Sequence, residues 1–367
     1  MRIAFDVRPL LEDAPSGVSV YTRMLFETLS ASPNFDVYPV VTGRSPVCLS
    51  ESAEKKLKRI AIPNPILNVS LFASQRPVFL SSEDADSYVL PNWNFLSLPN
   101  TLPLTLVVHD LSFIRNPKWY SSKQRLWHKA VKPRALVERA EKIIAVSEWT
   151  KQDLISLFRV PEDRISVLYP TPSVFVSSEM KTSTLSLPEK FIFFLGTLEE
   201  RKNPVALVEA FDLIAAKHAD LHLYLAGKSG YGAEKVKRVI ARSRFCDRIH
   251  CLGYVSPADR ALLYARAAGF VYPSFYEGFG IPVLDALRAG LPVITANRTA
   301  MIEVVRDAGV VVEPYDVSQI ALAIDEILSN KTFSQMLRNR ALERASVFSE
   351  DMKEGVERVF GGVGSID

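Results

Sequence analysis

The chain has 367 residues, of which 48% are apolar and 23% are charged, and its formal net charge is +3. This balance is typical of a soluble protein with two α/β domains, and it excludes disordered, collagen-like and coiled-coil chains. A net charge of +3 is too small to indicate a nucleic-acid partner, and we expect none.

Neither a membrane span nor a disulfide framework is indicated. Apolar runs such as Phe191–Leu195 are far shorter than the roughly 20 residues that a membrane span needs. Cys48, Cys246 and Cys251 are isolated, which argues against disulfides and against a zinc site. The start, MRIAFDVRPL, reaches Asp6 too early for the apolar region of a signal peptide. We therefore expect a cytoplasmic protein.

The first half of the chain alternates between short β-rich runs and amphipathic stretches of helical length. Strands are predicted at Arg2–Val7, Val37–Thr42, Arg59–Ile62, Tyr88–Pro91, Leu104–Asp110, Lys142–Ser147 and Ile165–Tyr169. Helical stretches are predicted at Val18–Ser30, Ser122–Ala140 and Ser147–Phe158. Pro133 interrupts any single long helix in the second of these stretches.

The second half shows the same alternation. Strands are predicted at Phe191–Gly196, Leu221–Ala226, Arg248–Leu252, Gly269–Pro273, Pro292–Thr295 and Gly309–Val312. Helices are predicted at Pro204–Lys217, Ala233–Ser243, Ala258–Ala267 and Pro282–Arg288. Alternation of this kind predicts an α/β protein with two parallel sheets covered by helices.

A linker is predicted between Thr171 and Lys190, where the chain is rich in Ser, Thr and Pro and keeps no period. We place one doubly wound, Rossmann-like domain at 1–175 and a second at 186–345. Ligands bind such sheets at the carboxyl ends of the strands, and two facing domains hold them in the cleft between. Motifs that directly follow strands are therefore the candidates for function.

Two candidates lie in the first domain. Gly17 opens a helix after the first strand, where free amides and the helix dipole favour an anion. The alternative is a flexible loop capped by Ser16. His109 and Asp110 end a strongly apolar strand, where α/β enzymes place functional groups. The alternative there is a turn-forming aspartate beside a histidine with satisfied hydrogen bonds. No second ligand has suitable spacing nearby, so a metal site is not indicated.

Two further candidates lie in the second domain. Arg201 and Lys202, in GTLEERKN, form a cationic pair suited to a diphosphate, although a solvated loop of charges is the alternative. In YPSFYEGFGIPVLDALRAG, the glycines of EGFG allow backbone amides to approach a ligand. Glu277 offers a carboxylate to hydroxyl groups, and Asp285 follows eight residues later on the next helix.

The segment EGFGIPVLDALRAG resembles the E-x-F-G-x-P-x-x-E-A-x-A-x-G signature of retaining, nucleotide-sugar-dependent glycosyltransferases of family 4, which have the GT-B fold. GTLEERKN, VVHDLSF, IIAVSEWTKQDL, LGYVSPADRALLYARA and AGVVVEPYD are similar to segments of its polysaccharide mannosyltransferase branch, in the same order. The resemblance covers nearly the whole chain.

The resemblance implies roles at the donor sugar and the phosphates. Glu277 would hold the sugar hydroxyls and His109 would lie against the transferred sugar, so both are the candidate catalytic residues. The cationic pair would bind the diphosphate. The remaining candidate substrate-binding residues are Gly17, Asp110, Val255, Ser256, Gly278, Phe279, Gly280, Ile281 and Asp285. Of these, Val255 and Ser256 match the loop near the nucleotide base.

Three positions depart from the family pattern. Arg288 stands where the signature has a small Ala, which bears on helix packing rather than chemistry. Asp285 stands where the signature has Glu, which puts the grip on the ribose in doubt more than the activity. Thr197 stands where some relatives carry Arg, which leaves Arg201 and Lys202 as the main neutralising charges.

The resemblance implies transfer of a hexose, foremost mannose from GDP-mannose, to a glycan or lipid-linked glycan acceptor, without a metal or other cofactor. A UDP-hexose-dependent transferase and a sugar-nucleotide epimerase of the same fold stay open. So does a catalytically silent subunit that binds a sugar nucleotide.

Two segments outside these motifs carry expectations of their own. Basic and aromatic residues are interleaved over 115–142, which predicts peripheral contact with the inner face of a membrane; the alternative is a solvated helix face. A C-terminal helix is predicted at 346–361, with Val347, Met352, Val356 and Phe360 on one face. The resemblance implies that this helix crosses back to the first domain.

Overall fold

The computed structural model describes residues 1–12, 15–60, 62, 70, 80, 83–171, 183, 185–348 and 351–361. The chain forms two compact units: Met1–Thr171 with Glu350–Asp367, called unit 1, and Pro172–Ser349, called unit 2. Most of the predicted linker lies outside the described residues, as does Ala61 in the predicted strand Arg59–Ile62.

Unit 1 is built on a seven-stranded parallel sheet with the order β3-β2-β1-β4-β5-β6-β7. Its strands are β1 (Arg2–Asp6), β2 (Asp36–Thr42), β3 (Lys58–Ile60), β4 (Ser87–Leu90), β5 (Leu104–Val108), β6 (Lys142–Ala145) and β7 (Ile165–Val167). The strand order reverses at β1, because β2 and β4 pair with its opposite edges. This is the doubly wound arrangement that the alternation predicts.

The helices of unit 1 follow the strands in turn. They are α1 (Gly17–Ala31), α2 (Glu51–Lys55), α4 (Ser112–Arg115), α5 (Ser122–Ala130), α6 (Pro133–Arg139), α7 (Glu148–Phe158) and α16 (Asp351–Phe360). The stretch predicted over Ser122–Ala140 is two helices, because Pro133 starts α6 after Lys132 adopts a left-handed conformation with φ 55°.

Unit 2 is built on a six-stranded parallel sheet with the order β10-β9-β8-β11-β12-β13. Its strands are β8 (Lys190–Leu195), β9 (Leu221–Ala226), β10 (Ile249–Gly253), β11 (Gly269–Tyr272), β12 (Val293–Ala296) and β13 (Gly309–Val312). The order reverses between β8 and β11, so the loops that follow these two strands lie at the switch point where such sheets bind ligands.

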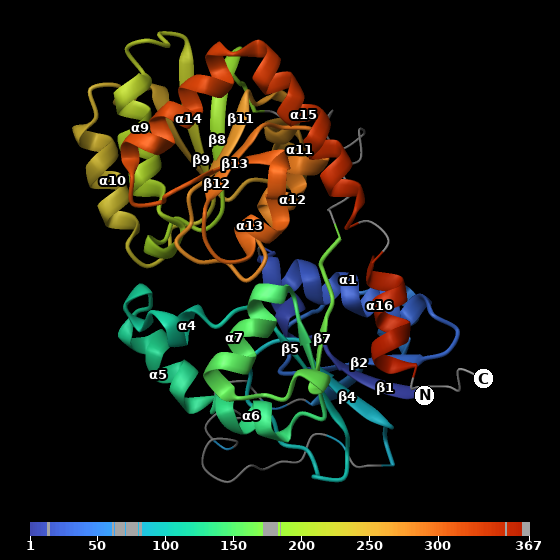
Figure 1. Ribbon diagram of the computed structural model, residues 1–367. Coiled ribbons are helices and arrows are strands. Elements are labelled where there is room, and N and C mark those ends of the chain that lie inside the picture. The colour runs from blue at the N-terminus through green and yellow to red at the C-terminus, as the bar shows by residue number, and fades with distance from the viewer. Residues whose placement is uncertain are drawn as a thin grey trace. The chain divides into compact units, whose positions relative to one another are not determined.

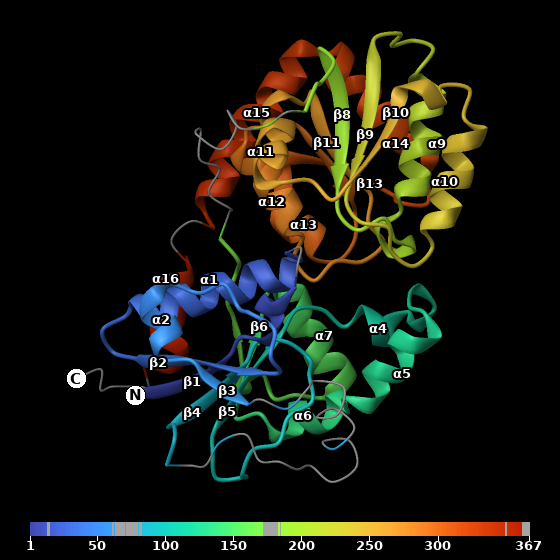
Figure 2. The ribbon, with the colours of Figure 1, turned by 180° about the vertical axis from the view of Figure 1, so that it is seen from behind.

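Helices cover both faces of the second sheet. They are α9 (Pro204–Ile214), α10 (Ala233–Arg242), α11 (Pro257–Arg266), α12 (Ile281–Arg288), α13 (Ala300–Val305), α14 (Val317–Ser329) and α15 (Lys331–Ser346). Figures 1 and 2 show α9, α10 and α14 on one side of this sheet and α11 and α12 on the other. The central strands are consequently almost wholly apolar, and Phe191, Ile192, Phe193 and Phe194 of β8 are completely buried.

The last helix, α16, belongs to unit 1 and lies beside α1 (Figure 1). The ring of Phe360 packs edge to face on that of Phe35, with 6.1 Å between centroids. The carboxylate of Glu357 accepts hydrogen bonds from the Ser32 hydroxyl at 2.5 Å and the Asn34 amide at 3.1 Å. The amine of Lys142 donates to the carbonyl of Val359 at 2.6 Å.

The predicted apolar face of this helix is correct at three positions and wrong at Val347. Met352, Val356 and Phe360 are buried. Val347 instead caps the end of α15 and is 61% exposed, because α15 continues through Ser346 and a separate helix starts at Asp351. None of the helices within the described residues has the length and apolar character needed to cross a membrane.

Phe360→Ala should lower the free energy of unfolding of unit 1 by about 3–5 kcal/mol, because it leaves a cavity against Phe35. Urea unfolding followed by tryptophan fluorescence measures the change. Lys353→Ala, at an exposed position of the same helix, is the control and should stay within about 0.5 kcal/mol. Equal losses in the two variants would contradict the packing of α16 on α1.

Candidate active site

The predicted site residues lie at the carboxyl ends of strands in both units. Gly17, His109 and Asp110 belong to unit 1, and all the other predicted residues belong to unit 2. In unit 2, Arg201 and Lys202 follow β8 in the short 3-10 helix η4 (Glu200–Lys202), and Glu277 follows β11.

The two loops at the switch point are joined by a buried ion cluster. The amine of Lys202 donates to Glu277 Oε1 at 2.9 Å and to the hydroxyl of Tyr272 at 2.6 Å. The guanidinium of Arg201 donates to Glu277 Oε2 at 3.4 Å and to the carbonyl of Tyr276 at 2.8 Å. Arg201 also pairs with Glu199 at 2.9 Å. The structure thus brings together three of the predicted residues.

The environment of Glu277 uses three residues that sequence reasoning missed. The hydroxyls of Ser274 and Tyr272 donate to Oε1 at 2.9 and 3.1 Å. The backbone N–H of Glu277 donates to Oγ1 of Thr299 at 3.1 Å. The only sequence signal for Tyr272 and Ser274 is their place in YPS at the end of β11, whereas Thr299 has none.

The charges of this cluster hold one another in their ionised forms. Burial alone would raise the pKa of Glu277, but the cations of Lys202 and Arg201 outweigh it and lower that pKa to about 2. Burial alone would lower the pKa of Lys202, but the attraction of Glu277 outweighs it and raises that pKa. Burial, reinforced by Glu277, raises the pKa of Tyr272 to about 12. At neutral pH the phenol is therefore neutral between a carboxylate and an ammonium group.

The loop from Gly278 to Gly280 packs tightly before α12. Gly280 has φ +92°, a conformation that strains a residue with a Cβ, and a Cβ there would also lie 2.3 Å from Cε of Met301, which would have to shift. The ring of Phe279 is buried and packs edge to face on Phe348, with 5.5 Å between centroids. Ile281 is the first residue of α12.

Three other predicted residues of unit 2 lie outside the two loops that carry the ion cluster. Asp285 lies within α12 and is only 1% exposed. Val255 and Ser256 follow β10, which β9 separates from β8. The hydroxyl of Ser256 caps α11, since it accepts the N–H of Asp259 at 3.1 Å.

In unit 1, His109 is a neutral imidazole at pH 7. Burial is the main cause that lowers its pKa to about 4. Its Nε2 lies 2.8 Å from the carbonyl oxygen of Pro91, which can only accept, so Nε2 carries the proton. The ring packs edge to face on Tyr21 of α1, with 5.2 Å between centroids.

The other two predicted residues of unit 1 lie at the start of α1 and directly after His109. Gly17 is the first residue of α1, which begins with a capping box between Ser16 and Ser19. Asp110 accepts the N–H and the hydroxyl of Ser112 at 3.1 and 2.7 Å. The structure thus links the helix that Gly17 opens to His109 through Tyr21, a contact that sequence reasoning missed.

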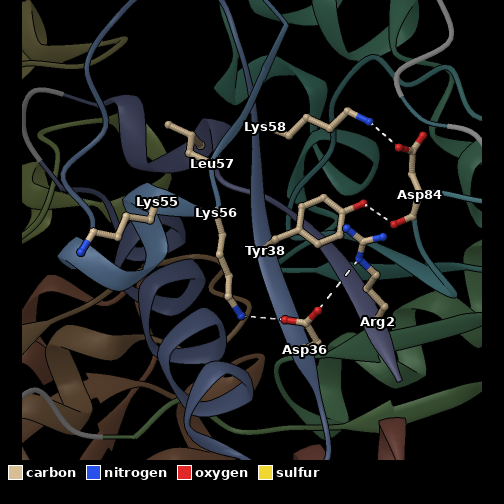
Figure 3. A pocket seen from close by; sticks show the side chains of 8 residues that line it. All are labelled: Arg2, Asp36, Tyr38, Lys55, Lys56, Leu57, Lys58 and Asp84. Carbon is tan, nitrogen blue, oxygen red and sulfur yellow. Dashed lines mark hydrogen bonds and ion pairs between the residues drawn. The ribbon is translucent and has the colours of Figure 1, made fainter.

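A hollow at the opposite ends of the strands in unit 1 is a weaker candidate (Figure 3). Lys56 pairs with Asp36 and Lys58 pairs with Asp84, each at 2.6 Å. The hydroxyl of Tyr38 donates to the carbonyl of Asp84 at 3.0 Å. Its charged groups are largely paired with one another, so we place the candidate active site at the carboxyl ends instead. The described residues contain no group of three or more His, Cys, Asp or Glu that could hold a metal ion.

Comparison with known families identifies the chain. The model described as "Glycosyl transferases group 1" matches residues 176–344, and "Glycosyltransferase Family 4" matches residues 15–171. O-antigen chain mannosyltransferase B of Escherichia coli is 32% identical over 95% of this chain and 96% of the relative. The chain belongs to glycosyltransferase family 4. The resemblance inferred from the motifs is confirmed, and this glycosyltransferase takes a nucleotide-sugar donor.

Solved structures confirm the GT-B fold of this glycosyltransferase. Sucrose-phosphate synthase from Thermosynechococcus elongatus has a TM-score of 0.75 and 20% identity, covering 98% of this chain and 97% of that one. The Anabaena protein HepE in complex with UDP-glucose has a TM-score of 0.75 and 15% identity, covering 99% and 100%.

The ionised carboxylate of Glu277 should stabilise the folded protein, and this contribution should depend on pH. Since the folded pKa of about 2 lies below the ordinary 4.5, the ionised carboxylate stabilises the fold fully above about pH 4.5. This contribution is lost as the pH falls toward 2. Glu277→Gln should therefore lower stability by about 3–5 kcal/mol at pH 7, where it leaves buried cations without their carboxylate.

The urea midpoints of wild type and Glu277→Gln, measured from pH 7 to pH 2.5, should converge as the pH falls. Glu234→Gln is the control, because Glu234 pairs with Lys237 on the exposed surface of α10. A difference between wild type and Glu277→Gln that stays constant down to pH 2.5 would show that the Glu277 carboxylate does not carry the effect.

Proposed function

We propose that this glycosyltransferase transfers mannose from GDP-mannose, with retention of configuration, to a glycan or lipid-linked glycan acceptor. The observation that carries the proposal is the buried pair of Lys202 and Glu277, which sets a cation and a carboxylate side by side at the switch point of unit 2. The choice of mannose is supported by the mannosyltransferase name of the relative that aligns over 95% of the chain.

The chemistry follows from these charges. Glycosyl transfer breaks the anomeric C–O bond through an oxocarbenium-like transition state, while negative charge grows on the departing diphosphate. The ammonium group of Lys202 has three hydrogens, of which Tyr272 and Glu277 take two, and we assign the third to the diphosphate. Together with Arg201 it would stabilise the leaving group. Glu277 would hold the hydroxyls of the donor sugar.

Several further roles are proposed on the family resemblance. Gly278 and Gly280 would present backbone amides to the donor, Val255 and Ser256 would lie near the base, and Asp285 would hold the ribose. Gly17 would lie beside the phosphates. Because the side chains of Arg201 and Lys202 supply positive charge at the diphosphate, we propose that no metal ion takes part and that the departing phosphate deprotonates the acceptor.

His109 fits a binding role at the transferred sugar better than general acid catalysis. Its pKa of about 4 leaves it uncharged at neutral pH, and its Nε2 proton is committed to the Pro91 carbonyl. The opposite ring nitrogen, Nδ1, is then an acceptor that suits a sugar hydroxyl.

A UDP-hexose donor is the second candidate, since the solved structure of HepE, which shares the fold, is in complex with UDP-glucose. A panel of GDP-mannose, UDP-glucose and an ADP-hexose separates the two, with thermal shift and donor hydrolysis as readouts, each measured with and without EDTA. We expect the largest stabilisation and the fastest hydrolysis with GDP-mannose. A preference for UDP-glucose would refute GDP-mannose as the donor and support a UDP-hexose in its place. Binding without any hydrolysis or transfer would indicate a silent binding subunit, and activity lost in EDTA would refute metal independence.

We further propose that unit 1 contacts the inner, anionic face of a membrane. Within the predicted segment 115–142, four cations bind protein groups and are therefore less suited to lipid headgroups. These are Arg115, Arg134, Arg139 and Lys142. By contrast, Lys123 and Lys129 of α5 are exposed, and the apolar Leu126 between them is 69% exposed. An apolar side chain among exposed cations suits the headgroup region.

Lys123→Glu combined with Lys129→Glu should weaken binding to vesicles with 30% phosphatidylglycerol by tenfold or more, at about 1 kcal/mol per basic residue near the surface. Cosedimentation measures the change, with pure phosphatidylcholine vesicles as the uncharged reference. Lys235→Glu combined with Arg238→Glu, on α10 of unit 2, is the matched control. Wild-type protein that binds neither vesicle type would refute the membrane contact.

A further inference from the structure

A buried threonine lies beneath the loop that carries Glu277. Thr299 follows β12, directly precedes α13, and is 6% exposed. Its Oγ1 accepts the backbone N–H of Glu277 at 3.1 Å, across 22 residues of sequence. It makes no hydrogen bond to cap α13, although it occupies the capping position. The hydroxyl therefore serves the neighbouring loop rather than its own helix.

The backbone of Thr299 is held in an unfavourable conformation. Its φ is 55° and its ψ is −150°, a combination that side chains with a Cβ rarely adopt and that is costlier still for a β-branched residue. Glycine would adopt it without strain, but glycine has no hydroxyl to offer Glu277. The backbone strain at Thr299 thus accompanies the one hydrogen bond that its Oγ1 accepts from the loop.

The residues after Thr299 hold the same loop at a second point. Ala300 and Met301 are completely buried, and Met301 fills the space that a Cβ on Gly280 would take. The segment from Thr299 to Met301 therefore contacts the loop from Glu277 to Gly280 at both of its ends. With Gly278 and Gly280 in it, this loop has many backbone conformations to choose from, and the two contacts select one.

We propose that Thr299 is a positioning residue of the transferase: its strained backbone directs Oγ1 to the N–H of Glu277 and thereby fixes the Glu277 carboxylate for the donor sugar. This inference rests on the proposed function. A reacting group displaced by about 1 Å can lose about 100-fold in rate, so one hydrogen bond to its backbone is enough to matter.

The opposite end of α13 provides a matched control. Arg306 also has a positive φ, 46°, with ψ −121°, but it is exposed and lies at the end of the helix away from Thr299. Arg306→Gly relieves backbone strain in the same helix without touching the Glu277 loop. It should raise the melting temperature and leave kcat unchanged.

The test is a series of three variants, Thr299→Ser, Thr299→Ala and Thr299→Gly. Serine keeps the acceptor oxygen, and its kcat for donor hydrolysis and transfer should stay within about threefold of wild type. Alanine and glycine both lose the oxygen, and kcat should fall by about 100-fold in each. Glycine removes the strain as well, so its melting temperature should exceed that of the alanine variant. Affinity for the nucleoside diphosphate should change by less than about threefold in all three, because Arg201 and Lys202 are untouched.

The combination separates positioning from a purely structural role. If Thr299 only stabilised the fold, kcat would recover in the glycine variant together with its stability, and that result would overturn the inference. Wild-type kcat in the alanine variant would overturn it as well. A wild-type protein that turns over none of the panel donors would instead refute the proposed function, and this failure is seen before any variant is made.

Discussion

The ion pair between Lys202 and Glu277 is the contact on which the rest of the candidate site in unit 2 depends. Each charge would be costly alone in a buried position, and each is acceptable only because the other lies 2.9 Å away. The pair joins the loop after β8 to the loop after β11, where the strand order reverses. Separating the two loops would separate buried charges, so the pair holds the two loops of the switch point together.

Pairing two charges leaves further hydrogen-bonding capacity to be satisfied, and this explains the composition of the end of β11. Tyr272 and Ser274 donate to the same carboxylate oxygen that Lys202 binds. The ring of Tyr272 stacks on Phe194 at 5.3 Å between centroids, which ties the polar cluster to the aromatic core of the sheet. A mixed residue such as tyrosine suits this place, because its ring is buried while its hydroxyl finds polar partners.

The sequence predicts the elements of this fold well because their signal is local. Each predicted strand is present, with ends shifted by only a few residues, and Pro133 marks the break between α5 and α6. The contacts of the site are harder to predict from the sequence, since Lys202 and Glu277 are 75 residues apart and only the family motif brings them together. The place of Thr299 beside this loop could not be predicted from the sequence, because threonine is among the residues least expected at positive φ. The prediction for Val347 is wrong because the apolar pattern of the sequence does not mark where α15 ends and α16 begins.

Positive-φ residues flank the ion cluster on two sides, and their chemistry differs. Asn203, directly after Lys202, has φ 56°, a conformation that asparagine tolerates, and its side-chain amide donates to the carbonyl of Pro314 at 2.7 Å. Thr299 has no such tolerance and is held by its surroundings. The charges are thus paired and oriented before any donor arrives, so a donor need not organise them. In the proposed mechanism the donor would share the ammonium group of Lys202 with Glu277, and a pre-oriented pair would favour a ligand whose diphosphate and sugar hydroxyls fit both groups at once.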